Sequence, residues 1–193
     1  FVPIMSVIVL KSVLYDGWRH LFFVYPAFLL ISLAGLKALF EFIKAAFRGL
    51  AYRIACVFFA AAVAASLIGT SFFMVKYHPY QNVYFNPLIG NMENAKDKFE
   101  LDYWGLSYRQ ALEHIAKNDK EKVIKVSAAN PPARVNLLML KPEDRSRFVF
   151  VEDIKQSKYF LSNYRWHKEE YPFEEEFFSI KVDGAKIMVV YED

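Results

Sequence analysis

The sequence has little cysteine and few of the motifs that mark well-known catalytic centres. Its one cysteine, Cys56, rules out a disulfide within the chain, and inside an apolar run it is interpreted as a small apolar residue. A glycine-rich phosphate loop and the CxxC, HExxH and GxSxG motifs are all absent. The four histidines lack the spacing of metal ligands. No cofactor is therefore indicated, and dependence on a divalent metal stays open.

Charged residues are scarce up to Val75 and frequent after it. The first part carries 6 Lys and Arg against 2 Asp and Glu, whereas the remaining 118 residues carry 18 against 19. A later part of this size and balance is typical of one soluble domain. Nucleic-acid binding is not expected, because it requires a concentrated basic face.

The longest uncharged run spans the 22 residues from Ile54 to Val75. As a helix it would be about 33 Å long, which is enough to cross the hydrocarbon core of a bilayer. A buried helix of a soluble protein rarely stays uncharged for that distance, because one face normally meets water. We therefore predict a transmembrane helix here, and divide the chain into a membrane segment, residues 1–75, and a soluble domain, residues 76–193.

Two further apolar runs precede this span. Phe1–Val13 is interpreted as the end of one hydrophobic helix, so the chain is expected to be the C-terminal part of a longer polytopic protein. Leu21–Leu36 predicts a second span that can extend to Phe47 and that Pro26 is expected to bend. The fold class predicted is thus a membrane α-helical segment of two to three transmembrane helices followed by a small α/β domain with a mixed sheet.

The connection between the second and third spans is expected to be basic. It is assigned Lys37, Lys44, Arg48 and Arg53 against Glu41 alone, and short basic loops face the cytoplasm. The loop before the second span and the domain after the third would then share the exoplasmic side.

The later part alternates helix and strand signals. The predicted elements are a helix over Leu106–Asn118, a strand over Val123–Ala128, a helix from Asn130 to Leu140, strands over Phe148–Val151 and Tyr159–Ser162, and a hairpin of Phe177–Val182 and Lys186–Tyr191. Ser107 and Gln110 have capping-box spacing, and Asn130 is placed to cap the second helix. Asp183-Gly184 predicts the hairpin turn. This order favours a mixed sheet.

Two segments combine residue types that suit ligand binding. The loop Asp16–His20 brings together an acid, Arg19 and His20, which could grip a lipid phosphate, although the loop could equally anchor a tight turn to headgroups. Asp102, Tyr103 and Trp104 combine carboxylate and aromatic groups, as sugar sites do, but a capping network at a buried helix start gives the same pattern. His114 is expected at the surface, and His167, within Tyr164–His167, is expected to be structural.

Three segments resemble a known family. They are Tyr15-Asp16-Gly17-Trp18-Arg19-His20 with Phe23 and Tyr25-Pro26; Tyr77-His78-Pro79-Tyr80 with Tyr84-Phe85-Asn86; and Glu100 to Arg109, ELDYWGLSYR. Together they resemble the C-terminal part of bacterial membrane glycosyltransferases, the family 39-like enzymes of the GT-C fold that are related to protein O-mannosyltransferases and aminoarabinose transferases. The resemblance covers about residues 1 to 110.

The resemblance implies an enzyme that transfers a sugar from a polyprenyl-phosphate donor to a glycan, lipid or protein acceptor. It implies a bacterial inner-membrane location with the C-terminal domain in the periplasm. Arg19 and His20 would lie near the donor phosphate, and the candidate substrate-binding residues are Asp16, His78, Tyr80, Asn86, Asp102, Tyr103 and Trp104. The family's catalytic acidic residue, in its first exoplasmic loop, has no counterpart here, so no catalytic residue is assigned. The alternative is a non-enzymatic, membrane-anchored module that binds a glycan or a protein.

Overall fold

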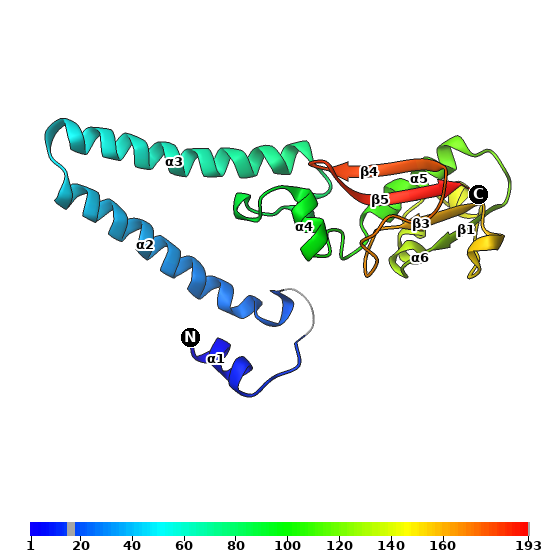
Figure 1. Ribbon diagram of the computed structural model, residues 1–193, viewed down its shortest axis with the longest axis horizontal. Helices are drawn as coiled ribbons and strands as arrows, with labels where there is room; N and C mark the ends of the chain where they lie inside the picture. Colours follow the sequence, from blue (N-terminus) through cyan, green and yellow to red (C-terminus); the bar gives the residue numbers. More distant parts are fainter. Residues whose placement is uncertain (15–17, 193) are drawn as a thin grey trace. The chain divides into compact units, whose positions relative to one another are not determined.

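The structure is a computed structural model that describes residues 1–14 and 18–192 (Figure 1). The chain forms two compact units, Phe1–Ile68 and Gly69–Asp193. The division between them falls inside one long helix, so the last turns of that helix belong to the second unit.

The first unit is helical. It contains α1 (Val2–Val9), the short 3-10 helices η1 (Trp18–His20) and η2 (Phe22–Val24), α2 (Tyr25–Ala46), and most of α3 (Gly49–Lys76). In the described part of the chain, two helical segments are long and apolar enough to cross a membrane, Phe22–Ala46 and Gly49–Lys76, and neither is buried by other parts of the protein. The expectation of two to three spans is confirmed, with these two candidate spans among the described residues.

The junction between α2 and α3 differs from the expected basic loop. Only Phe47 and Arg48 separate the helices, so Lys37 and Lys44 lie within α2 and Arg53 within α3. Lys44 pairs with Glu41 one turn earlier, at 3.1 Å. The expected bend at Pro26 was also wrong, because this proline occupies the first turn of α2, where its missing N–H has no helical partner to lose.

The second unit is the predicted α/β domain. After the 3-10 helices η3 (Gln81–Val83) and η4 (Pro87–Ile89), its elements are α4 (Met92–Lys98), α5 (Ser107–Asn118), β1 (Ile124–Ala128), α6 (Pro132–Leu137), α7 (Pro142–Arg145), β2 (Phe148–Phe150), η5 (Ile154–Gln156), β3 (Tyr159–Ser162), β4 (Glu176–Val182) and β5 (Ala185–Glu192). The strands form one sheet in the order β2-β1-β3-β5-β4. Strands β2, β1 and β3 are parallel, and β5 is antiparallel to both of its neighbours. The mixed sheet is confirmed.

Each face of the sheet has its own apolar layer. Helix α5 buries Tyr108, Leu112 and Ile115 on one face, against residues that include Leu161 and Val190. The opposite face carries a smaller cluster of Phe160, Tyr164, Val189 and Tyr191, covered by Tyr171 and Phe173 from the segment between β3 and β4. That segment had no predicted structure, and it serves as the cover of the second face.

The last turns of α3 pack against the α/β domain and form hydrogen bonds with it. Phe73 packs against the main core, the Thr70 and Tyr84 hydroxyls lie 3.2 Å apart, and the Tyr77 hydroxyl donates to Asp183 at 3.2 Å. Asp183 is in the turn that starts β5. Because β3 and β1 run antiparallel to β5, their carboxyl ends point toward the end of the sheet at which α3 enters.

Candidate functional site

Aromatic and polar side chains from three separate segments meet at the carboxyl ends of β1 and β3. Tyr103 and Trp104 come from the turn before α5, Asn130 follows β1, and Arg165 and Trp166 follow β3. We call these five residues the aromatic edge. In open α/β sheets, ligands bind at the carboxyl ends of parallel strands, beside the strand where the chain reverses its order. Here β1 is that strand, with β2 on one side and β3 on the other.

Three rings and one guanidinium of the aromatic edge are in contact with one another. The Arg165 guanidinium lies 3.9 Å from the centre of the Tyr103 ring and 4.2 Å from that of Trp166. Trp104 extends the stack with an edge-to-face contact on Tyr103, at 5.1 Å between centroids. The side chains of Trp104 and Trp166 are 59% and 69% exposed. Large apolar surfaces of this kind are unusual outside binding sites when they occur together.

A buried network of hydrogen bonds connects the segments that carry the aromatic edge. The Asn163 side chain accepts from the Asn130 amide at 2.8 Å and from the Tyr108 hydroxyl at 3.3 Å, and donates to the Asp102 carbonyl at 2.8 Å. The Asn130 amide also donates to the Arg165 carbonyl at 3.3 Å. Burial raises the pKa of Tyr108, so its hydroxyl stays protonated as a donor. The network links the turn before α5 to the ends of both strands.

Two polar atoms of the edge have no partner among residues 1–14 and 18–192. They are the Asn130 side-chain oxygen and the Arg165 Nε–H, both buried. Buried polar groups are nearly always satisfied, so a native exception calls for a reason. Here an acceptor and a donor are left open in the same site.

The backbone of the edge is held in conformations that side chains disfavour. Tyr164 and Trp166, on either side of Arg165, have φ of 58° and 64°. Each such residue costs on the order of 1 kcal/mol or more, and strain of this kind concentrates at functional sites. Gly105 has φ of 69°, and a Cβ there would lie 2.7 Å from Pro132 Cβ. The backbone around Arg165 and at Gly105 therefore adopts conformations that are strained for most residues.

Asp102 caps the start of α5. This was one of the two interpretations of the residue, and sugar binding was the other. Its carboxylate accepts from the Leu106 N–H at 3.0 Å and the Ser107 N–H at 2.9 Å, and also from the Ser107 hydroxyl. Asp102 is 1% exposed. The predicted Ser107–Gln110 capping box was wrong, because this longer-range cap satisfies the helix start and Gln110 accepts instead from the Tyr80 hydroxyl.

The remaining predicted site residues do not belong to the five residues of the edge. Arg19 and His20 are exposed in η1, which precedes η2 and α2 in the other compact unit, and Asp16 is outside the described residues. His78 contacts Gln81 at 2.7 Å through Nδ1, and the Asn86 side chain accepts from the Leu88 N–H at 3.0 Å. These two contacts close local turns. Of the predicted set, only Tyr103 and Trp104 have side chains in the aromatic edge.

Sequence reasoning missed Arg165, Trp166 and Asn130 as site residues. Asn130 had been assigned to cap α6, which was wrong: its amide is used by Asn163 and Arg165, and α6 has no side-chain cap. The sequence did contain a signal for these residues, because Asn130 and the segment Tyr164–His167 each begin two residues after the end of a predicted strand. Applying the rule on parallel-strand ends to those two positions would have found the site.

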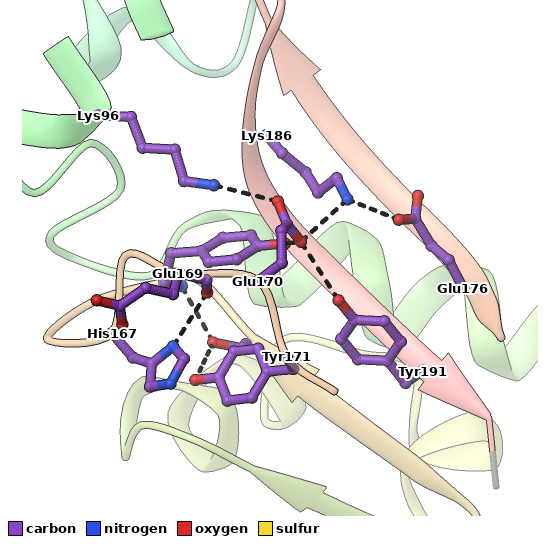
Figure 2. A network of polar contacts seen from close by, with 10 residues as sticks. Lys96, His167, Glu169, Glu170, Tyr171, Glu176, Lys186 and Tyr191 are labelled. Atoms are coloured by element: carbon purple, nitrogen blue, oxygen red, sulfur yellow. Dashed lines mark hydrogen bonds and ion pairs between the residues drawn. The ribbon is translucent and has the colours of Figure 1, made fainter. Parts of the chain in front are cut away.

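A brace of charged groups fixes the segment that carries Arg165 and Trp166 (Figure 2). The Glu170 carboxylate forms ion pairs with Lys96 from α4 at 3.4 Å and with Lys186 from β5 at 3.2 Å. It also accepts hydrogen bonds from the hydroxyls of Tyr164 at 2.6 Å and Tyr191 at 3.4 Å. Burial alone would raise the pKa of Glu170, but the hydrogen bonds from Tyr164 and Lys186 outweigh it, so this pKa lies below its usual range.

The brace itself offers no space for a ligand beyond a small molecule such as water. The adjoining cavity, lined by residues that include Lys96, Lys168 and Lys186, has a volume of about 10 Å³, which holds roughly one water. His167 stacks on Tyr171 at 4.2 Å, and the Tyr171 hydroxyl accepts from Ser162 at 2.9 Å. Figure 2 shows these rings beside the brace. We interpret the whole arrangement as support for the loop after β3, which agrees with a structural role for His167.

His114 is less exposed than expected. It is half-buried, with its ring stacked on Phe178 at 4.0 Å, and burial lowers its pKa. In the part of the chain that the structure describes, no group of three His, Cys, Asp or Glu residues is arranged to hold a metal ion. Comparisons with protein-family models, curated proteins and solved structures found no match for this chain.

Proposed function

We propose that this chain is part of an integral-membrane glycosyltransferase that moves a sugar from a polyprenyl-phosphate donor to an acceptor on the exoplasmic face of a bacterial inner membrane. In this proposal the soluble domain holds a sugar ring at the aromatic edge. The observation that carries it is the exposed stack of Trp104, Tyr103, Arg165 and Trp166, which lies at the end of the sheet where α3 enters.

The chemistry of the edge suits a sugar better than a purely apolar ligand. The C–H face of a pyranose packs on an aromatic ring, and exposed tryptophan offers a large rigid surface for it. Sugar hydroxyls accept hydrogen bonds, and the Arg165 guanidinium, beside the rings of Tyr103 and Trp166, is a donor group of the edge. The few polar groups among apolar walls are typical of small-molecule sites.

The donor end of the reaction is assigned to Arg19 and His20. Arg19 directly precedes the first candidate span, and the domain follows the second. If both helices cross the bilayer, these outer ends share one side, where Arg19 can bind a lipid phosphate. A positive group there would stabilise the charge that develops on the departing phosphate. The resemblance of the YDGWRH segment to membrane glycosyltransferases supports the same assignment.

The decisive experiment measures binding of undecaprenyl phosphate to the intact protein in lipid nanodiscs, by native mass spectrometry. We expect Arg19→Ala to weaken binding at least about tenfold, since a charge-assisted contact is worth roughly 1.5–3 kcal/mol. Arg48→Ala is the matched control, because it removes an arginine from the opposite end of α2. Equal effects of the two substitutions, or none, would remove the donor assignment.

The second candidate is a non-enzymatic module that binds a glycan or a protein at the membrane. One observation favours it: all five residues of the aromatic edge belong to the second compact unit. Under this alternative the protein binds sugar but neither binds nor consumes a polyprenyl-phosphate donor, and Arg19→Ala changes nothing.

A further inference from the structure

We propose that Arg165 recognises an oxyanion on the bound sugar, so that the aromatic edge selects acidic sugars, carrying a carboxylate or a phosphate, over neutral ones. This inference rests on the proposed sugar-binding role of the edge and adds the chemical class of its ligand. It concerns the soluble domain and does not depend on which donor the membrane part uses.

Arg165 differs from the other arginines of the domain in what its nitrogens contact. Arg109 pairs with Glu113 at 2.8 Å, Arg134 with Glu152, and Arg147 donates to the carbonyls of Ala116 and Glu121, both at 2.9 Å. Arg145 also reaches a carbonyl, that of Leu138, at 3.4 Å. Within residues 1–14 and 18–192, Arg165 alone of the five has neither a carboxylate nor a carbonyl acceptor. Its charge is held by aromatic rings only.

The ring contacts of Arg165 use none of its hydrogen-bonding capacity. The centres of the Tyr103 and Trp166 rings lie 3.9 and 4.2 Å from the guanidinium carbon, and a cation over a ring face is held by the charge of the ring and not by a hydrogen bond. The N–H groups lie in its plane and form a rigid fork that matches a carboxylate or a phosphate. A guanidinium already fixed by stacking loses little side-chain freedom when an anion binds.

The loop conformation supports this assignment independently of the stack. The two residues flanking Arg165 are the left-handed Tyr164 and Trp166, and the brace through Glu170 ties the same loop to α4 and β5. Strain maintained by surrounding contacts is characteristic of preorganised ligand sites. Here it orients one cation whose partner is missing from the described chain.

Two charged residues near Arg165 in the sequence or the loop have partners of their own. Glu100 is held by the Trp166 N–H, at 3.2 Å from one carboxylate oxygen, and Lys168 donates to the Asp97 carbonyl at 2.9 Å. Glu100 repels anions that approach its side of the loop. Only an oxyanion that reaches the Arg165 fork directly gains from the edge, which differs from a broad basic surface.

The test compares methyl β-D-glucuronide, glucose 6-phosphate and methyl β-D-glucoside as ligands of the intact protein in nanodiscs, with Kd measured by ligand-observed NMR. We expect at least one acidic sugar to bind about tenfold more tightly than the glucoside, because a charge-assisted hydrogen bond adds at least that much. The preference should shrink at high salt. Whichever acid binds best distinguishes carboxylate from phosphate recognition.

Arg165→Gln should abolish the acid preference, so that the Kd values of the acidic sugars and of the glucoside become about equal. Arg165→Lys, which keeps the charge without the fork, should retain only part of it. The control is Arg109→Gln, which removes the same charge from an exposed pair on α5 and should leave all three affinities unchanged. Thermal melts of each variant establish that the domain remains folded.

Three results would overturn the inference in different ways. Equal binding of acidic and neutral sugars would refute anion recognition while leaving the sugar-binding edge intact. Absence of binding by all three would refute both the inference and the proposed role of the edge. A parallel loss of acid and glucoside binding in Arg165→Gln would show that Arg165 only spaces the aromatic rings.

Discussion

At the scale of single residues, the site depends on backbone conformations that few side chains tolerate. Gly105 is the tightest case, since a Cβ would meet Pro132 at 2.7 Å and Tyr108 at 3.0 Å while φ stays at 69°. Gly184, in the β4–β5 turn, has φ of 89° and open space around it. Comparing the two glycines therefore separates the free-energy cost of a left-handed backbone from the cost of steric crowding by an added Cβ.

We predict that Gly105→Ala destabilises the domain by roughly 2–4 kcal/mol, because left-handed strain adds to overpacking. Gly184→Ala should cost only about 1–2 kcal/mol, the conformational part. Thermal denaturation followed by circular dichroism of the intact protein measures both. Equal losses would mean that the contact with Pro132 relaxes without cost and does not fix the turn that carries Trp104.

Single residues of the site were only partly predictable from sequence. Tyr103 and Trp104 are conspicuous because aromatic and acidic residues adjoin in one stretch. Arg165 is not, since its significance depends on stacking with Tyr103, a residue 62 positions away in the chain. A cation without a partner is a property of the fold and cannot be recognised from its neighbours in sequence.

At the scale of elements, the strands and the bounds of α5 were predicted well, and the side chains that cap the helices poorly. The period of apolar residues fixes a strand locally, so β3 and the closing hairpin were found nearly to the residue. Helix caps compete with distant partners. Asp102 displaced the expected Ser107 box, and Asn130 turned toward Asn163. The first of these hydrogen bonds spans five residues and the second 33, and a capping-box motif encodes neither.

The opposite end of the sheet is held by Asp119, at the end of α5. Its carboxylate, 2% exposed, accepts from Lys158 at 2.9 Å, from the Glu121 N–H at 2.7 Å and from the Tyr159 hydroxyl at 3.2 Å. Burial alone would raise the pKa of Asp119, but the hydrogen bonds from Glu121 and Lys158 outweigh it and lower that pKa. The interaction therefore joins α5 to the start of β3.

We predict that this joint weakens in acid. A carboxyl group with a lowered folded-state pKa stabilises the protein fully above its unfolded pKa of about 3.9, and that stability is lost as the pH falls through the folded value. The free energy of unfolding of the wild type should therefore decline below about pH 4 more steeply than that of Asp119→Asn.

Thermal melts at a series of pH values measure this dependence. Asp144→Asn, which changes a more exposed carboxylate 3.8 Å from Arg147, is the control and should keep the wild-type slope. If Asp119→Asn also kept that slope, Asp119 would not be the group that responds.

At the scale of the whole molecule, two apolar helices and a mixed α/β domain follow from hydrophobic length and period, and both were predicted. The boundary between α2 and α3 was not, because charged residues that favoured a loop are accommodated in helix ends. Long basic side chains can reach the interface from within a helix, so charge alone does not mark where a membrane helix stops.

The proposed topology predicts which sites share a side of the membrane. Replacing Cys56 with Ser removes the one cysteine, and single cysteines can then be introduced by Arg19→Cys, Arg48→Cys and Asn86→Cys. A membrane-impermeant maleimide added outside intact cells should label positions 19 and 86 and spare position 48. Labelling of 48 together with 86 would overturn the shared-face arrangement.

The eight residues from Gly69 to Lys76 belong to the apolar helix and also to the folded domain. Phe73 packs in the main core, and Thr70 meets Tyr84. The point at which hydrophobicity ends is therefore not the point at which the domain begins. A soluble domain that begins after Lys76 would lose core residues such as Phe73. One that begins at Gly69 would expose the apolar surface of two helical turns. Anyone expressing this domain alone must choose between those two defects.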